Sequence, residues 1–207
     1  KISVIANPVA KTLEEANPAQ AGPNGRFSLI AVGRLETQKG YDLLIPAFAT
    51  LAGRFPDWDL AIYGEGPARK DLESLIGETG MARRVVLNGL TREVEKALAA
   101  SHAMALPSRF EGFPNALTEA MAAGLPAVAF DGVADDLILD GETGLRASFA
   151  DPVASLAACL ERLMADGELR VRLGAAARAR VAAFSPEVHN ARWDELLRRV
   201  AGKTESQ

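Results

Sequence analysis

The sequence contains very little cysteine and no long hydrophobic run. Cys159 is the one cysteine among 207 residues, so no disulfide can form within the chain, which favours a reducing cytoplasm. No uninterrupted apolar stretch approaches the roughly 20 residues that a membrane-spanning helix needs. The first eight residues also lack the layout of a signal peptide. These absences argue against a disulfide-stapled secreted domain and against a membrane-spanning protein.

Excess positive charge and clustered histidines are missing as well. A net charge of −4 and a pI near 5.3 give no support to nucleic acid as a partner. His102 and His189 are too few and too far apart in the sequence to suggest a metal site. Asp57 and Asp59 match an Asp-x-Asp metal motif, but residues 58–63 alternate in the manner of a half-buried strand. The residues therefore favour a strand over a metal site at this position.

Short apolar runs alternate with helical patterns along most of the chain. Hydrophobic residues make up 48% and charged residues 24%, which is typical of a globular domain. Strands are predicted at residues 27–33, 58–63, 85–87, 103–106 and 127–130, and helices at residues 41–54, 67–76, 92–100 and 115–123. This alternation predicts an α/β fold whose parallel sheet is covered by helices on both faces.

The two ends of the chain have a different character. Residues 1–26 carry Asn-Pro and Gly-Pro punctuation and are predicted to be a linker. Residues 152–200 are rich in alanine, leucine and arginine, and they are predicted to form three additional helices. Residues 201–207 are predicted to be a disordered tail.

Polar and glycine-containing loops follow four of the predicted strands. They are Gly33-Arg34, residues 64–66, Asn88-Gly89 and residues 107–114. Ligands of such sheets bind beyond the carboxyl ends of the strands. We therefore expect these four loops to share one ligand site.

Residues 111–126 form the most informative segment, a loop that leads into a helix rich in small residues. The start of a helix presents unpaired N–H groups and a partial positive charge, which suit a phosphate. Glu111 and Glu119 bracket this start. Carboxylates repel a phosphate, so we expect them to accept hydrogen bonds from sugar hydroxyls instead. The segment therefore suggests a sugar nucleotide as ligand.

Three motifs together resemble those of the family 4 (group 1) retaining glycosyltransferases. They are Arg34 and Lys39 in the segment 32–40, the Tyr-Gly-Glu-Gly-Pro segment 63–67, and the segment 107–119. The resemblance covers about residues 27–200 and is to the C-terminal, donor-binding half of such an enzyme. It implies a Rossmann-like, doubly wound parallel sheet as half of a GT-B fold. It also implies a partner, the N-terminal acceptor-binding domain, with residues 1–26 as the remnant of the junction.

The resemblance implies a role for individual residues. Arg34 and Lys39 would hold the diphosphate of the donor, Glu111 would accept from the transferred sugar, and Glu119 from the ribose. These three residues, Glu111, Arg34 and Lys39, would be catalytic, because charge grows on the leaving phosphate as the glycosidic bond breaks. The other implied donor-binding residues are Gly33, Gly64, Asn88, Gly112, Phe113, Asn115, Ala116, Leu117 and Thr118.

The implied activity is transfer of a hexosyl group from a uridine diphosphate sugar to a glycan or a lipid-linked acceptor. The nucleotide sugar is a substrate, and the family needs no metal and no cofactor. The fragment alone is expected to be inactive. Two other functions stay open: an epimerase of similar fold acting on sugar nucleotides, and a non-catalytic module that binds them.

Two positions depart from the family pattern. Pro114 stands where many relatives have glycine, so it offers no N–H to a diphosphate, and donation would rest on Phe113, Asn115 and Ala116. Residues 131–137 are about two residues shorter than the corresponding family loop, which leaves the sugar unidentified.

A locally basic stretch leaves the cellular location partly open. Seven arginines lie between Arg170 and Arg199, and they suit either a solvated helix face or peripheral contact with a membrane. We expect a cytoplasmic protein, with association at the inner face of the membrane as the open alternative.

Overall fold

The structure, a computed structural model, describes residue 5, residues 7–9 and residues 14–204. Its centre is a six-stranded sheet in the order β3-β2-β1-β4-β5-β6, and every neighbouring pair of strands is parallel. The strands are β1 (Phe27–Val32), β2 (Trp58–Tyr63), β3 (Val85–Gly89), β4 (Ala103–Leu106), β5 (Ala127–Phe130) and β6 (Leu145–Ala147).

Seven α-helices and two short 3-10 turns connect or follow the strands within this part of the chain. The α-helices are α1 (Tyr41–Leu51), α2 (Arg69–Glu78), α3 (Val94–Ala99), α4 (Asn115–Ala122), α5 (Pro152–Ala165), α6 (Gly167–Val181) and α7 (Pro186–Thr204). The 3-10 turns are η1 (Thr37–Lys39) and η2 (Ala182–Phe184).

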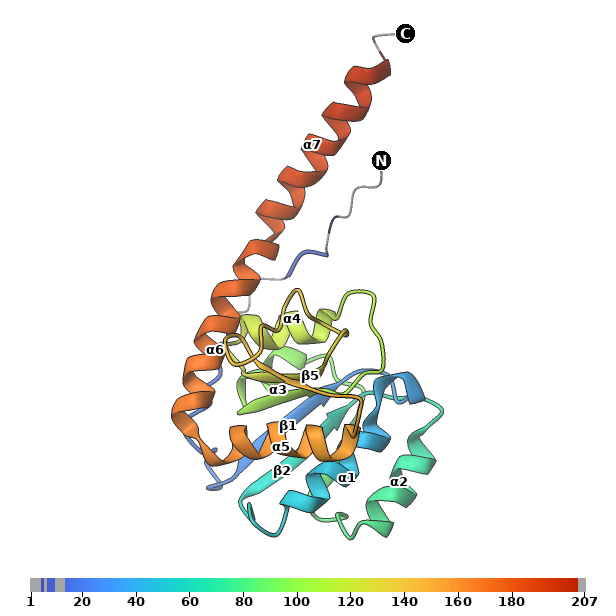
Figure 1. Ribbon diagram of the computed structural model, residues 1–207, viewed down its shortest axis with the longest axis vertical. Coiled ribbons are helices and arrows are strands. Elements are labelled where there is room, and N and C mark those ends of the chain that lie inside the picture. The colour runs from blue at the N-terminus through green and yellow to red at the C-terminus, as the bar shows by residue number, and fades with distance from the viewer. Residues whose placement is uncertain (1–4, 6, 10–13, 205–207) are drawn as a thin grey trace.

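Helices cover both faces of the sheet (Figure 1). On one face α1 packs against α2 and α5, and on the other α4 packs against α3 and α6. Every residue of β4 and β5 is buried, as expected for central strands sandwiched between two helical layers. The structure therefore confirms the predicted α/β fold with a doubly wound parallel sheet.

The structure differs from the sequence prediction at two short elements. Strand β6 was not predicted, because it has three residues and places Arg146 between its two apolar ones. The 3-10 turn η1 was not predicted either, since a single turn carries no periodic signal. The predicted bounds of α1 and α2 also shift by two or three residues, a common uncertainty at helix ends.

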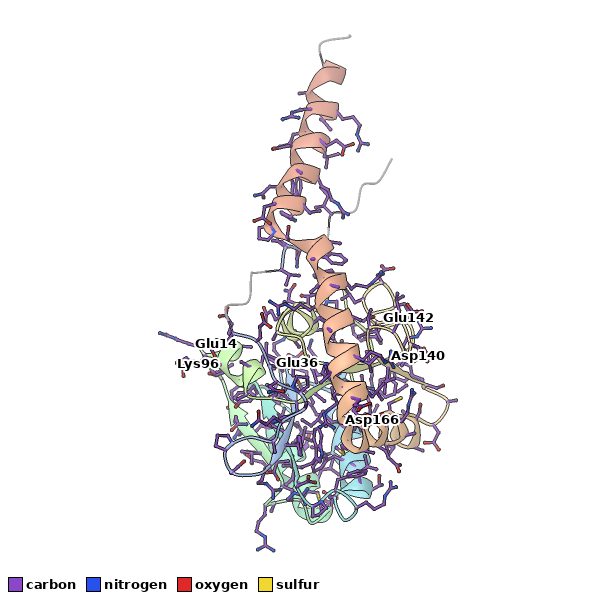
Figure 2. The ribbon with its side chains drawn as sticks, turned by 90° about the vertical axis from the view of Figure 1, so that its left-hand side faces the viewer. Glu14, Glu36, Lys96, Asp140, Glu142 and Asp166 are labelled. Atoms are coloured by element: carbon purple, nitrogen blue, oxygen red, sulfur yellow. The ribbon has the colours of Figure 1, made fainter. Side chains whose placement is uncertain are left out.

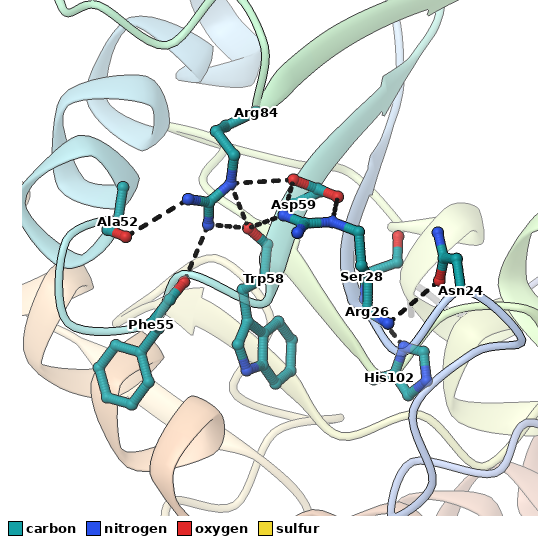
Figure 3. Close-up of polar contacts among 9 residues, drawn as sticks. All are labelled: Asn24, Arg26, Ser28, Ala52, Phe55, Trp58, Asp59, Arg84 and His102. Carbon is teal, nitrogen blue, oxygen red and sulfur yellow. Dashed lines mark hydrogen bonds and ion pairs between the residues drawn. The ribbon is translucent and has the colours of Figure 1, made fainter.

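The edge of the sheet away from the strands' carboxyl ends is held by a network of charged side chains (Figure 3). Asp59 forms ion pairs with both Arg26 and Arg84. Arg84 also donates to the carbonyl oxygens of Phe55, at 2.8 Å, and Trp58. Asp59, the second carboxylate of the Asp-x-Asp pattern, is thus engaged by two guanidinium groups.

His102 lies in the same region and is buried in the fold. Its Nδ1 accepts from the Ser28 backbone N–H at 2.9 Å, and its Nε2 lies 2.9 Å from the Gln20 carbonyl oxygen. Burial lowers the pKa of His102, and the two contacts together fit a neutral ring with its proton on Nε2. His102 therefore ties β1 to the segment before it.

The three helices predicted for residues 152–200 are present as α5, α6 and α7. Asp151 caps α5 by accepting from the Ala154 N–H, and Asp166, labelled in Figure 2, caps α6 by accepting from the Leu169 N–H at 2.9 Å. Helix α7 projects well beyond the α/β body (Figures 1 and 2). No helix in the described part of the chain combines the length and apolar character needed to cross a bilayer.

Four arginines of the basic stretch bond to the body of the protein. Arg170 is 3% exposed, donates to the Pro18 carbonyl at 2.6 Å and stacks over Phe27 and Trp58. Arg172, Arg178 and Arg180 contact the Gly141 carbonyl, the Glu15 carboxylate and the Asp136 carbonyl. These contacts serve the fold, and they engage part of the charge that suggested a membrane surface.

The predicted terminal segments lie partly outside the described residues. In the predicted linker, residues 1–4, 6 and 10–13 are outside, whereas the Ala16 N–H donates to the Ala123 carbonyl at 2.9 Å. In the predicted tail, α7 continues to Thr204 and residues 205–207 are outside.

Candidate functional site

A cavity of about 220 Å³ opens at the carboxyl ends of β1, β2 and β3. Its walls come from the last residues of β1 and β2, from the segments that follow the three strands, and from the first residue of α3. The lining residues are Val32, Gly33, Arg34, Tyr63, Gly64, Glu65, Leu90, Thr91 and Val94. The cavity thus lies at the sheet edge where the sequence predicted a ligand, and it contains three of the predicted residues.

Glycine at position 64 allows the turns after β1 and β2 to touch. A Cβ at Gly64 would lie 1.9 Å from the Gly33 carbonyl oxygen, which no side chain can tolerate. Gly33 is enclosed in a similar way, because a Cβ there would lie 2.9 Å from Tyr41 Oη and 3.2 Å from Lys39 Cε. Because both glycines lack a Cβ, the two turns approach each other closely, and the side chains of Lys39 and Tyr41 pack against Gly33.

Lys39, which packs against Gly33, forms an ion pair with Glu111. Lys39 Nζ lies 2.7 Å from Glu111 Oε1, and the two side chains are 18% and 8% exposed. Ser108, which is fully buried, donates to the same oxygen at 2.6 Å. Among the residues that the structure describes, none bonds to Glu111 Oε2. The carboxylate is thus anchored through one oxygen and has the other available.

The turn that carries Lys39 and the loop that carries Glu111 are braced against each other. The Arg109 N–H donates to the Gln38 carbonyl at 2.8 Å, and Gln38 Nε2 donates to the Phe110 carbonyl at 2.9 Å. The Arg109 guanidinium bonds both oxygens of Asp42 at 2.9 and 2.7 Å. These bonds join segments about 70 residues apart in sequence and fix the geometry of the Lys39–Glu111 pair.

Arg34 takes a more exposed position than Lys39. It lines the cavity, its side chain is 72% exposed, and its nearest ion-pair partner is Glu36 at 3.2 Å. Such an exposed pair contributes little to stability, so Arg34 can reorient toward a ligand at small cost. Asn88, another predicted residue, is exposed on β3 and does not line the cavity.

The start of α4 has fewer unpaired N–H groups than the sequence predicted. The Leu117 and Thr118 N–H groups donate to the Pro114 carbonyl at 3.0 and 3.1 Å, and the Asn115 N–H donates to the Phe113 carbonyl at 3.0 Å. The Thr118 hydroxyl donates to the Asn115 carbonyl. Within the described residues, the N–H groups of Gly112, Phe113 and Ala116 have no acceptor.

Glu119 is half-buried on α4 and faces α3. Burial and the negative charge of Glu95 raise the pKa of Glu119, and no described residue bonds to its carboxylate. Val94, the first residue of α3, lines the cavity. Glu119 is therefore an acceptor without a protein donor, on the side of α4 that faces this helix.

Two residues of the site, Ser108 and Tyr41, were not predicted from the sequence. Ser108 lies between the buried strand β4 and the loop that carries Glu111, where an uncharged serine is not distinctive. The sequence pattern indicates Tyr41 only as the first residue of a helix. Neither carries charge, and only their contacts in three dimensions connect them to Glu111 and Gly33. The sequence therefore carries no local signal for either residue.

The chain also aligns with known proteins. Residues 14–180 match the family described as "Glycosyl transferases group 1". The chain belongs to this family. Across the described residues, no group of three or more histidine, cysteine, aspartate or glutamate side chains is placed to hold a metal ion.

Individual relatives of this group 1 glycosyltransferase chain have named activities. The present chain is 38% identical over 157 residues to the alpha-D-kanosaminyltransferase of Streptomyces kanamyceticus, and the match covers 73% of this chain and 40% of that protein. It is 35% identical over 170 residues to a GDP-mannose-dependent phosphatidylinositol monomannoside mannosyltransferase of Mycolicibacterium smegmatis, covering 76% and 44%. The chain thus spans less than half the length of these relatives.

Solved structures support the fold. A TarM variant of S. aureus, crystallised with fondaparinux, alpha-GlcNAc-glycerol and UDP, superposes with a TM-score of 0.84 at 24% identity over 94% of this chain and 39% of that one. At this identity the likeness concerns the fold alone. It confirms that the sheet and its flanking helices have the Rossmann-like architecture of a GT-B half.

Proposed function

We propose that this chain is the donor-binding half of a retaining glycosyltransferase and that it binds a sugar nucleotide at the carboxyl edge of its sheet. In the whole enzyme, a hexosyl group would pass from the donor to a glycan or a lipid-linked acceptor. The Lys39–Glu111 pair beside the cavity lined by Arg34 carries this proposal. This pair places a cation, which suits a phosphate, beside a carboxylate, which can accept hydrogen bonds from the sugar joined to that phosphate.

The diphosphate would lie between Gly33, Lys39 and the loop before α4. Lys39 and Arg34 supply positive charge, and the N–H groups of Gly112, Phe113 and Ala116 have no other acceptor among the described residues. When the glycosidic bond breaks, negative charge accumulates on the leaving phosphate. Fixed cations and N–H groups stabilise that charge without reorganising, which lowers the barrier. No metal enters this scheme.

The transferred sugar would bind through Glu111. Because Lys39 and Ser108 both hold Oε1, Oε2 is free to accept from a sugar hydroxyl. The brace between Arg109 and Asp42 keeps the loop from moving away as the ligand enters. The same carboxylate thus orients the sugar against the diphosphate that Lys39 holds.

The nucleoside would occupy the cavity itself. Leu90 and Val94 offer apolar contact to a base, and Glu119 offers a carboxylate to the ribose hydroxyls. A hydroxyl donor would relieve the cost of leaving Glu119 half-buried and unpaired. We assign the base as uracil, because UDP is bound in the TarM structure that shares this fold, although the mycobacterial relative named above depends on GDP-mannose.

Transfer itself would require a second domain. The chain spans 40% and 44% of the two curated relatives, so the remainder of the enzyme would bind the acceptor and close the site. The chain by itself would bind donor and transfer nothing. A cytoplasmic location completes the proposal.

Replacing Arg34 with alanine tests the donor site in the isolated chain. We expect UDP to bind the parent chain measurably by calorimetry and the Arg34→Ala variant about tenfold more weakly, since one charge-assisted hydrogen bond to a phosphate is lost. Arg83→Ala is the matched control, because Arg83 is exposed and precedes β3 at the opposite edge of the sheet. Equal UDP affinity for Arg34→Ala and Arg83→Ala would remove Arg34 from the site, and absence of UDP binding by the parent would refute the proposal.

A further inference from the structure

Tyr41 has a buried ring and a hydroxyl that points at the proposed phosphate position. It begins α1, two residues after Lys39, and the side chain is 2% exposed. Its Oη lies 2.9 Å from the point that a Cβ of Gly33 would occupy, and Lys39 Cε lies 3.2 Å from the same point. Gly33 in turn lines the cavity. The hydroxyl therefore reaches the junction between the cavity and the Lys39–Glu111 pair.

The hydroxyl makes no hydrogen bond to any residue that the structure describes. The oxygen is not sealed inside the protein, because Arg146 Nε is the one buried side-chain polar atom without a hydrogen-bond partner among the described residues. Water or a ligand can therefore reach the Tyr41 oxygen, whereas the ring is held in the core. A hydroxyl of this kind can be satisfied by a ligand that arrives at the site.

The surroundings determine what the hydroxyl can offer. Burial and the negative charge of Glu111 both raise the pKa of Tyr41, so the group stays protonated at neutral pH. A protonated phenol can donate one hydrogen bond. Because Lys39 stands beside it, the acceptor that fits best is an oxygen carrying negative charge.

We infer that Tyr41 Oη donates a hydrogen bond to a phosphate oxygen of the donor, the same phosphate that Lys39 contacts. The inference rests on the proposed function and adds a specific third group to the phosphate site. Arg34 and Lys39 attract the anion, whereas Tyr41 fixes the direction of one of its oxygens. Because α1 packs in the core of the domain, this donor is held more rigidly than either cation.

The test uses the 207-residue chain and three probes: inorganic pyrophosphate, UDP and uridine. Tyr41→Phe removes only the oxygen and keeps the ring in the core. We expect pyrophosphate and UDP each to bind about tenfold more weakly, while uridine affinity and the melting temperature stay as in the parent. Thr50→Val is the matched control, because it also removes a hydroxyl from α1, but Thr50 donates to the Ala47 carbonyl near the far end of that helix and does not line the cavity. It should leave pyrophosphate binding unchanged.

The outcomes separate this inference from the proposed function. If the parent binds UDP and Arg34→Ala weakens that binding, but Tyr41→Phe binds pyrophosphate and UDP like the parent, Tyr41 has no part in phosphate recognition. If Tyr41→Phe weakens a UDP-sugar such as UDP-glucose but not UDP or pyrophosphate, the hydroxyl serves the sugar and the inference is wrong. If the parent binds neither UDP nor pyrophosphate, both this inference and the proposed function fail.

Discussion

Replacing Lys39 with methionine is expected to lower sugar transfer by the full-length enzyme by about 10²–10³-fold, the usual effect of losing one fixed group that stabilises developing charge. Methionine keeps the length and apolar character of the side chain but removes the cation beside the leaving diphosphate. It also leaves Glu111 without its ion-pair partner, held only by Ser108. The turnover number under saturating donor is the quantity to measure.

Lys70→Met is the matched control for this effect. Lys70 is exposed on α2 and does not line the cavity, so its replacement should leave turnover within about twofold of the parent. Thermal unfolding of both variants shows whether the fold survives. A folded Lys39→Met enzyme that turns over as fast as Lys70→Met would contradict the role given to Lys39.

Replacing Gly40 with alanine is expected to destabilise the chain by about 2–5 kcal/mol. Gly40 has a φ of 69°, which costs an L-residue free energy, and a Cβ there would lie 1.9 Å from the Pro107 carbonyl oxygen. The overlap is with backbone, so no side chain can move aside to relieve it. The change would also push the Lys39 turn away from the loop that carries Glu111. Urea unfolding of the isolated chain measures the loss.

Gly77→Ala provides the comparison for Gly40→Ala. Gly77 lies inside α2, and nothing lies within 4 Å of the position of its Cβ. Alanine there should raise the free energy of unfolding by about 0.5–1 kcal/mol, because glycine is a poor helix former. If the two substitutions have similar effects, the close approach of Gly40 to Pro107 does not hold the two loops together.

The sequence predicted the sheet well because its signal is local and periodic. Strands β1, β2, β4 and β5 are short apolar runs bounded by turns, and their order in the chain implies parallel pairing through crossover helices. Because the carboxyl ends of parallel strands share one edge, Gly33, Gly64 and the Glu111 loop could be placed together without knowledge of the strand order. The predicted site follows from that edge and from the resemblance of its motifs.

The finer features of the site depend on contacts that sequence spacing does not encode. Lys39 and Glu111 are 72 positions apart, and nothing local indicates that they form an ion pair or that Ser108 shares Oε1. The use of the Leu117 N–H within α4 follows from the turn geometry at Pro114. The helical pattern of α1 indicates only that position 41 is apolar, so it does not predict a role for the Tyr41 hydroxyl.

The carboxyl edge of this sheet is the sugar-nucleotide site that we propose. Amide nitrogen–proton NMR spectra of the isotope-labelled chain, recorded as UDP is added, show which residues the nucleotide contacts. We expect the largest shifts at Gly33, Gly112, Phe113 and Ala116, with residues of the opposite edge, such as Arg26 and His102, unchanged. Shifts concentrated at Arg26 and His102, or no shifts at millimolar UDP, would contradict this proposal.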